Sequence, residues 1–170
     1  MDNTCSKKQE ESLSLSSIWI FLLASLLHFG YSFTHFYPLS FISAVNESVW
    51  EHIKIIFFAA LFCNLFLYIR KFKGNSGFIS GLAPSLASIL LTVPFLFYGY
   101  SGILGFNLLV IDLLITFISA YIPQSILRRF ICSTKSYDSY KVLSILLVVA
   151  MIFMFFLFTW YPPSLPLFIH

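Results

Sequence analysis

The sequence predicts an all-α fold, a polytopic transmembrane helix bundle with five spanning helices. Of its 170 residues, 59% are hydrophobic and only 10% are charged, and the mean hydropathy is +0.89. A spanning helix needs about 20 apolar residues, so the chain has room for five or six crossings and almost none for a soluble domain. This composition excludes soluble nucleotide-binding folds, and a net charge of +3 does not favour nucleic-acid binding.

The first apolar run covers residues 18–37. Lys7 and Lys8 precede it, as in a signal peptide, but the run is too long for one and lacks a small-x-small cleavage site. We therefore expect a cytoplasmic N-terminal tail over residues 1–17 and a retained helix over residues 18–37. Residues 18–161 would then form a single five-helix transmembrane domain.

The second predicted helix covers residues 47–69. Asn46 precedes it as a favourable N-cap, and Val45 and Trp50 have the spacing of a hydrophobic staple. Glu47 lies at the positive end of the helix dipole, where a carboxylate is stabilising. These features indicate that the helix begins at an aqueous edge of the membrane.

The remaining predicted helices cover residues 78–98, 103–122 and 142–161. The last is almost uniformly apolar, ends at the Pro162-Pro163 pair and is expected to face lipid. The third helix carries a stripe of small residues at three- and four-residue steps, which allows close approach of a neighbouring helix. This stripe consists of Gly77, Gly81, Ser85, Ser88 and Thr92.

Basic residues predict the orientation of the chain. Nine of the ten Lys and Arg residues lie in the N-terminal tail or in the second–third and fourth–fifth helix connections, and only Lys54 lies on the other side. Cytoplasmic connections carry an excess of Lys and Arg. We therefore expect a multi-pass protein of the cell (plasma) membrane with a cytoplasmic N-terminus and a short external C-terminal tail over residues 162–170.

The basic connection before the last helix offers a contact with anionic lipid. Arg128 and Arg129 lie among apolar residues, so this segment could rest on the inner leaflet of the lipid bilayer. An ordinary basic cytoplasmic loop is the simpler interpretation. No nucleic-acid partner is expected, and the oligomeric state stays open.

The densest polar cluster lies at the start of the second helix. Glu47, Glu51 and His52 fall within six residues, more than an N-terminal cap needs, and are the candidate catalytic residues. His35 is expected near the same side, so His35, Glu47, Glu51 and His52 are candidate ligands of a divalent metal. Their spacing matches no named metal motif. The alternative is a set of solvated interface residues with Trp50 as an aromatic anchor.

A second group of polar residues is predicted inside the membrane. His28 lies ten residues after Ile18, about 15 Å deep, and Asp112 lies nine residues after Ile103, about 14 Å deep. Because unpaired ionisable groups are costly there, we expect these two side chains to pair. With His35 they would form a polar path through the membrane.

Two strings carry a resemblance to a known family. The string N-E-S-V-W-E-H-I-K at residues 46–54 and the closing P-P-S-L-P-L-F at residues 162–168 resemble a family of small uncharacterised prokaryotic integral membrane proteins, a domain of unknown function. The resemblance implies a polytopic membrane protein and draws attention to Glu47, Trp50, Glu51 and His52. It implies no activity, substrate or cofactor.

Three functions follow as hypotheses. The first is transport or proton and ion handling through an outward-facing polar pocket built from the first, second and fourth helices. The second is a membrane-embedded hydrolase that uses a metal or an acid/base pair. The third is a structural or assembly subunit whose polar residues only fix helix packing. The sequence does not decide whether the protein is an enzyme.

Overall fold

Five long helices form the described part of the protein, residues 6–169 of a computed structural model, and no strand occurs there. Each is long and apolar enough to cross a membrane, which confirms the predicted fold class. The long helices are α1 (Lys7–Thr34), α2 (Val49–Leu67), α3 (Ser76–Leu104), α4 (Leu109–Ile131) and α5 (Lys141–Trp160). The short helical segments are η1 (Tyr37–Phe41), η2 (Tyr68–Phe72), η3 (Asp138–Tyr140) and η4 (Pro166–Phe168).

Helix α1 begins and ends earlier than the sequence predicts. A capping box starts it, because the Gln9 amide donates to Ser6 Oγ and the Ser6 amide donates to Gln9 Oε1. Residues 7–17 are therefore helical and continuous with the predicted first helix. The helix ends where His35 adopts a left-handed backbone with φ of 50°. His28 consequently lies six residues, about 9 Å, from the end of α1, instead of nine residues from the predicted end at residue 37.

The turn between α3 and α4 also differs from the prediction. Helix α3 continues to Leu104 and stops at Gly105, whose φ of +76° suits a residue without a side chain. Helix α4 begins at Leu109 instead of residue 103, which leaves Asp112 in its first turn. Asp112 therefore lies three residues after the start of its helix, instead of the nine residues that the sequence predicts.

The stripe of small residues on α3 allows a close approach of a neighbouring helix, as the sequence predicts, and at Gly77 and Gly81 that helix is α4. A Cβ atom added to Gly81 would lie 2.6 Å from Phe130 Cβ, and one added to Gly77 would collide with the Phe130 carbonyl group. The two helices can approach this closely only because these positions lack side chains.

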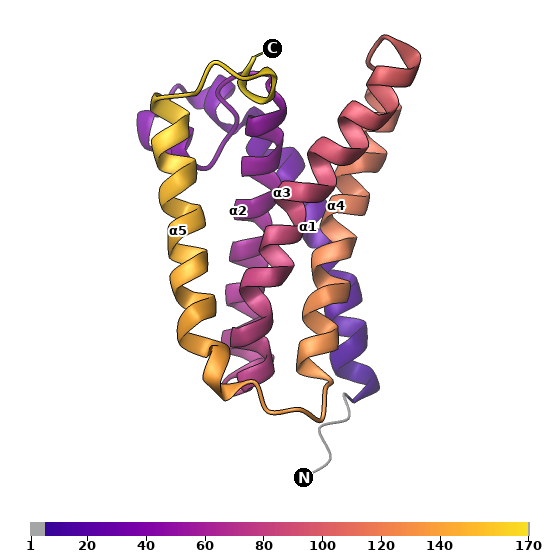
Figure 1. The fold of residues 1–170 in the computed structure, drawn as a ribbon, viewed down its shortest axis with the longest axis vertical. Helices are drawn as coiled ribbons and strands as arrows, with labels where there is room; N and C mark the ends of the chain where they lie inside the picture. Colours follow the sequence, from indigo (N-terminus) through magenta and orange to yellow (C-terminus); the bar gives the residue numbers. More distant parts are fainter. Residues whose placement is uncertain (1–5, 170) are drawn as a thin grey trace.

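Helix α2 is the most enclosed helix and α5 the least. In their apolar stretches, 56% of the residues of α2 are buried, against 17% for α5. Helix α5 stands at one side of the bundle in Figure 1, with most of its apolar side chains exposed. The exposure of these apolar side chains is what a lipid-facing last helix requires.

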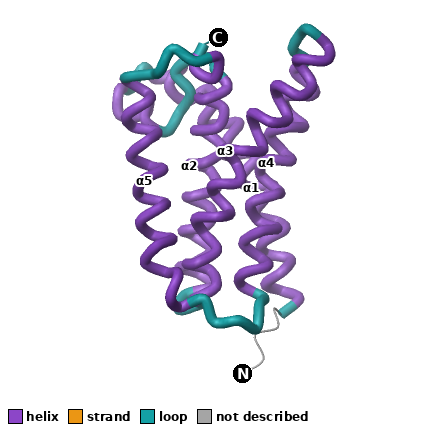
Figure 2. Tube along the Cα trace, in the orientation of Figure 1, coloured by secondary structure: helices purple, strands orange, loops and turns teal. Residues whose placement is uncertain are grey.

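The connections gather at two ends of the bundle. The segment from residue 35 to residue 48 lies at the same end as η4 and the last turn of α5 (Figure 2). The start of α1 and the connection between α4 and α5 lie at the opposite end (Figure 1). The polar site described next belongs to the first of these ends.

Candidate metal centre

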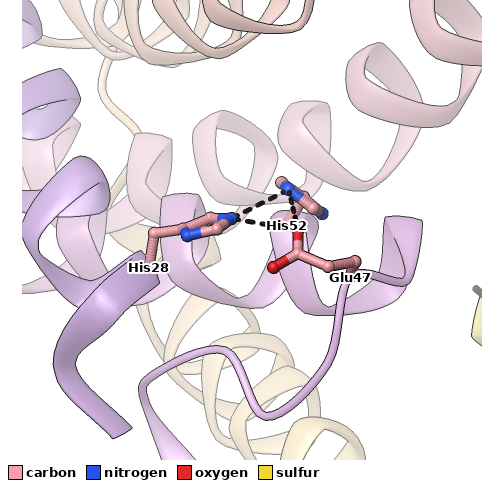
Figure 3. A group of neighbouring side chains, drawn as sticks. All are labelled: His28, Glu47 and His52. Atoms are coloured by element: carbon pink, nitrogen blue, oxygen red, sulfur yellow. Dashed lines mark hydrogen bonds and ion pairs between the residues drawn. The ribbon is translucent and has the colours of Figure 1, made fainter. Parts of the chain in front are cut away.

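Three side chains from separate segments meet near the end of α1. His28 comes from α1, Glu47 from the turn before α2, and His52 from the first turn of α2, and all three point toward one another (Figure 3). His28 Nε2 lies 3.3 Å from His52 Nε2 and 3.3 Å from Glu47 Oε2. His52 Nε2 lies 3.8 Å from Glu47 Oε2. One donor atom from each residue thus lies within 4.8 Å of the others, a grouping that could hold a metal ion.

The local sequence explains how Glu47 and His52 come to lie together. Asn46 Oδ1 accepts a hydrogen bond from the Ser48 amide at 2.9 Å, which closes a tight turn around Glu47. Ser48 then caps α2 by accepting from the Glu51 amide at 3.4 Å. The turn and the cap hold Glu47 just before the helix and His52 one turn into it.

The backbone fixes the orientation of the His52 ring. Its Nδ1 lies 2.9 Å from the carbonyl oxygen of Ser48. A carbonyl oxygen can only accept, so Nδ1 carries the hydrogen and donates it, which leaves a lone pair on Nε2 of the neutral ring. A metal-binding histidine usually donates its other ring N–H to such an acceptor, often a backbone carbonyl oxygen.

His28 Nε2 faces two acceptors at the same distance. It can carry one hydrogen at most, yet both the His52 Nε2 lone pair and the Glu47 carboxylate lie 3.3 Å away. A cation between the three atoms would satisfy all of them. For a tetrahedral zinc site with Zn–N bonds of 2.0–2.1 Å, neighbouring ligand atoms are about 3.3–3.4 Å apart. Two of the three separations match that value.

The three donors line a pocket of about 260 Å³ that has room for a further ligand. The Glu47 side chain is 68% exposed, whereas those of His28 and His52 are 23% and 31% exposed, so Glu47 is the most accessible of the three. The pocket involves α1, α2 and α4, as expected, together with α3. Its other lining residues are Val49, Ile56, Val93, Phe97, Asn107, Leu109, Asp112, Ile115 and Thr116.

Asp112 shares this pocket with His28 but pairs with a different residue. Its Oδ1 accepts a hydrogen bond from the Tyr100 hydroxyl at 2.5 Å. Among residues 6–169, no hydrogen bond or ion pair joins His28 and Asp112, so the predicted pairing is wrong. The reason is the late start of α4, which moves Asp112 to the rim of the pocket.

Glu51 does not belong to the group around His52. Its carboxylate forms a buried ion pair with Lys54, with Oε2 and Nζ 2.6 Å apart, and also accepts from the Val45 amide at 2.9 Å. Adjacent helix residues project about 100° apart, and here Glu51 turns inward while His52 faces α1. The prediction that Glu51 and His52 serve one pocket is therefore wrong in its geometry.

His35 also stays outside the candidate centre. It is exposed, ends α1, and rests edge-on against Tyr31 with ring centroids 6.1 Å apart. Of the four metal ligands predicted from the sequence, the structure brings together Glu47 and His52, and adds His28. No local motif marks His28 as a ligand, because its proximity depends on where α1 ends.

Trp50 links the two strings that carry the family resemblance. It is 5% exposed, not an interfacial anchor, and its ring packs against Phe155 and Phe168 with centroid separations of 4.8 Å. Phe168 belongs to the closing P-P-S-L-P-L-F string. The end of the chain thus folds back over the start of α2 and covers the side opposite His52.

The fold and the site define the class of protein: an all-α bundle of five candidate membrane spans with a two-histidine, one-carboxylate cluster at one end. The chain belongs to a family described as a family of unknown function, DUF6512, whose profile matches residues 1–170. The resemblance to a family of unknown function is confirmed to that extent. Neither the curated proteins nor the solved structures contain a significant match to the chain.

Proposed function

We propose that this protein is a membrane-embedded, metal-dependent hydrolase whose ion is held by His28, Glu47 and His52. The observation that carries the proposal is the convergence of two imidazole nitrogens and one carboxylate oxygen at separations of 3.3, 3.3 and 3.8 Å. Two histidines and one carboxylate suit zinc, and three protein ligands leave a coordination position for water.

The pocket supports hydrolytic chemistry at such an ion. A bound metal lowers the pKa of its water, so that a hydroxide forms near neutral pH. An ion held by His28, Glu47 and His52 would supply an activated water. Asp112 would accept its proton as the water oxygen adds to the carbonyl carbon of an ester or amide and the bond to the leaving group breaks. Asp112 then returns the proton to the leaving group. Its place in the same pocket supports this role.

The lining of the pocket indicates the kind of substrate. Val49, Phe97 and Leu109 offer apolar surface beside the polar groups. The pocket lies toward one end of helices that each contain an apolar stretch long enough to cross a membrane. An amphiphilic ester or amide, with its cleaved bond near the membrane boundary, would contact both kinds of surface.

The geometry favours hydrolysis over the transport hypothesis. The descending path required His28 and Asp112 to pair near the membrane centre, below His35. Instead, His28 and Asp112 lie near one end of the bundle and have different partners, while His35 is exposed. Clustering of acids and histidines at one depth is the arrangement expected of a hydrolytic site.

Metal analysis of the purified protein tests the proposal directly. We expect about one zinc ion per chain after purification in detergent, and background levels in H28A and H52A. His35→Ala is the matched control, because His35 lies outside the cluster, and should keep the metal.

Zinc-loaded protein should hydrolyse ester or amide amphiphiles, and D112N should lose this activity while keeping the metal. Equal metal content in wild type and H52A would contradict the proposal.

A further inference from the structure

A large apolar groove lies away from the candidate metal centre, between the outer faces of α1 and α2. It has a volume of about 640 Å³. Most of its lining is apolar, and several of these side chains are more than half exposed, including Trp19 and Phe66. The lining residues are Ser12, Leu15, Ser16, Trp19, Leu22, Leu23, Leu26, Phe62, Cys63, Phe66, Leu67 and Lys71.

The groove runs along the helix axis. Its residues on α1 recur every three or four positions from Ser12 to Leu26, and so form one continuous face. Fourteen residues of helix span about 21 Å. Half of a hydrocarbon core of about 30 Å is about 15 Å, so the groove is long enough for a lipid chain that crosses one leaflet.

One end of the groove is cationic. The Lys71 ammonium group donates a hydrogen bond to Ser12 Oγ at 2.5 Å, and both residues line the groove. Arg70 lies beside it, with its guanidinium 5.5 Å from the centre of the Phe66 ring, and Lys73 follows two residues later. Three cations within four residues attract an anionic group to this end.

The lining distinguishes a lipid chain from another helix as the occupant. Helices that associate in membranes usually present small residues, so that their backbones approach closely. This groove instead presents Trp19, Phe62 and Phe66 beside leucines, which leave an uneven apolar channel. A flexible acyl chain fills such a channel, and the ammonium group at its end matches a phosphate.

We propose that the groove is a binding site for an anionic phospholipid, with one acyl chain between α1 and α2 and its phosphate on Lys71. The site shares no residue with the candidate metal centre and does not depend on the proposed hydrolase activity. The anionic-lipid contact proposed at Lys71 is separate from the one that the sequence suggests at Arg128 and Arg129.

Trp19 provides a probe inside the groove. The full chain with Trp160→Phe, which removes the exposed tryptophan of α5, would be reconstituted into phosphatidylcholine membranes. Trp50 is 5% exposed and should contribute a constant signal. Phosphatidylglycerol with brominated acyl chains should quench Trp19 at a lower mole fraction than brominated phosphatidylcholine.

The Lys71 variants decide whether the phosphate binds there. A lysine near an anionic surface contributes about five-fold to binding, so Lys71→Ala should raise the half-quenching mole fraction of phosphatidylglycerol about five-fold. Lys71→Gln keeps a donor for Ser12, and should show the same loss if Lys71→Ala fails to fold. Lys135→Ala is the matched control, because Lys135 is exposed in the connection between α4 and α5 and does not line the groove, and it should leave the value nearly unchanged.

Three results would overturn the lipid site. The first is equal quenching by the two brominated lipids, and the second is an unchanged value in both Lys71 variants. The third is a Trp19 signal insensitive to either lipid in a protein that cross-links as a dimer, which would assign the groove to a second chain. Zinc content measured on the same samples separates these outcomes from failure of the hydrolase proposal.

Discussion

The carboxylate of Glu51 lies 2.6 Å from the ammonium group of Lys54, and both side chains are almost completely buried. Lys54 also donates to the carbonyl oxygen of Ser40 at 2.8 Å and to Thr159 Oγ1 at 3.2 Å, while Glu51 accepts from the Val45 amide. The pair therefore joins α2 to η1, to α5 and to the segment that carries Glu47. Glu51 does not contact the candidate centre. Through its bond to the Val45 amide, it holds the segment that carries Glu47.

Removal of one partner of this ion pair should be strongly destabilising. Lys54→Met leaves a buried carboxylate without a counter-charge, for which we expect a loss of about 3–5 kcal/mol. Glu51→Gln should also destabilise, because it leaves the ammonium group unpaired. In the double variant E51Q/K54M neither charge remains, so part of the stability should return. Thermal unfolding in detergent measures all three variants, and additive effects would contradict a coupled pair.

The sequence predicts the fold and part of the site for physical reasons. Five apolar runs of spanning length predict a helix bundle, because a helix satisfies all backbone hydrogen bonds within one segment. Glu47 and His52 stand out because acids and histidines are rare in such a composition. Their grouping with His28 depends on where α1 ends, and that position follows from the left-handed backbone of His35, which no sequence pattern marks.

The predicted contacts of Asp112 and Glu51 are wrong because they depend on features that local sequence does not show. Apolar composition continues through the residues around 103–108, so periodicity could not show that α3 extends to Leu104 and α4 starts afterwards. Similarly, the spacing of Glu51 and Lys54 permits an ion pair. Whether that pair faces water or the protein interior depends on η1 and α5, which pack against it through contacts distant in sequence.

The close approach of α3 and α4 predicts a sharp difference between two glycines. Gly81→Ala adds a methyl group that meets Phe130 Cβ at 2.6 Å, so α4 must shift, and overpacking of this kind costs about 1–3 kcal/mol. Gly99→Ala is the control, because nothing lies within 4 Å of its added Cβ. Thermal unfolding should show a lower Tm only for Gly81→Ala. Equal Tm values for the two variants would contradict the packing.

A buried amide pair joins α2 to α4 below the candidate centre. Gln124 Nε2 donates to Asn64 Oδ1 at 2.9 Å, and both residues are at least 98% buried. Gln124→Leu should destabilise by about 1–3 kcal/mol, because the Asn64 amide would lose its partner in an apolar interior. The double variant N64L/Q124L should lose less than the sum of the two single effects. A double-mutant cycle in detergent would reveal the coupling, and strict additivity would argue against the bond.

Zinc should stabilise the wild-type protein against heat. A ligand that binds only the folded state, at 100 times its dissociation constant, adds about 2.7 kcal/mol. The Tm should therefore rise with added zinc and return to its starting value after chelation. Glu47→Ala should reduce the rise and His28→Ala should abolish it, whereas His35→Ala should retain it. An identical rise in His28→Ala would locate the zinc elsewhere.

The orientation of the bundle is the last prediction, and it rests on charge and on the arrangement of the ends. The connections 68–77 and 132–140 and the start of α1 carry most of the basic residues, and cytoplasmic ends carry this excess. An alkaline phosphatase fused after residue 170 or inserted at residue 106 should be active in a bacterial host. Insertions at residues 75 and 135 should be inactive there.

Green fluorescent protein at the same four positions provides the complementary control, because it should fluoresce only at residues 75 and 135. This orientation places the Glu47 carboxylate and the candidate metal centre on the external side, and the Lys71 end of the lipid groove at the cytoplasmic leaflet, where anionic lipids attract basic residues. Phosphatase activity at residue 75 with none at residue 106 would invert the bundle and move the centre to the cytoplasm.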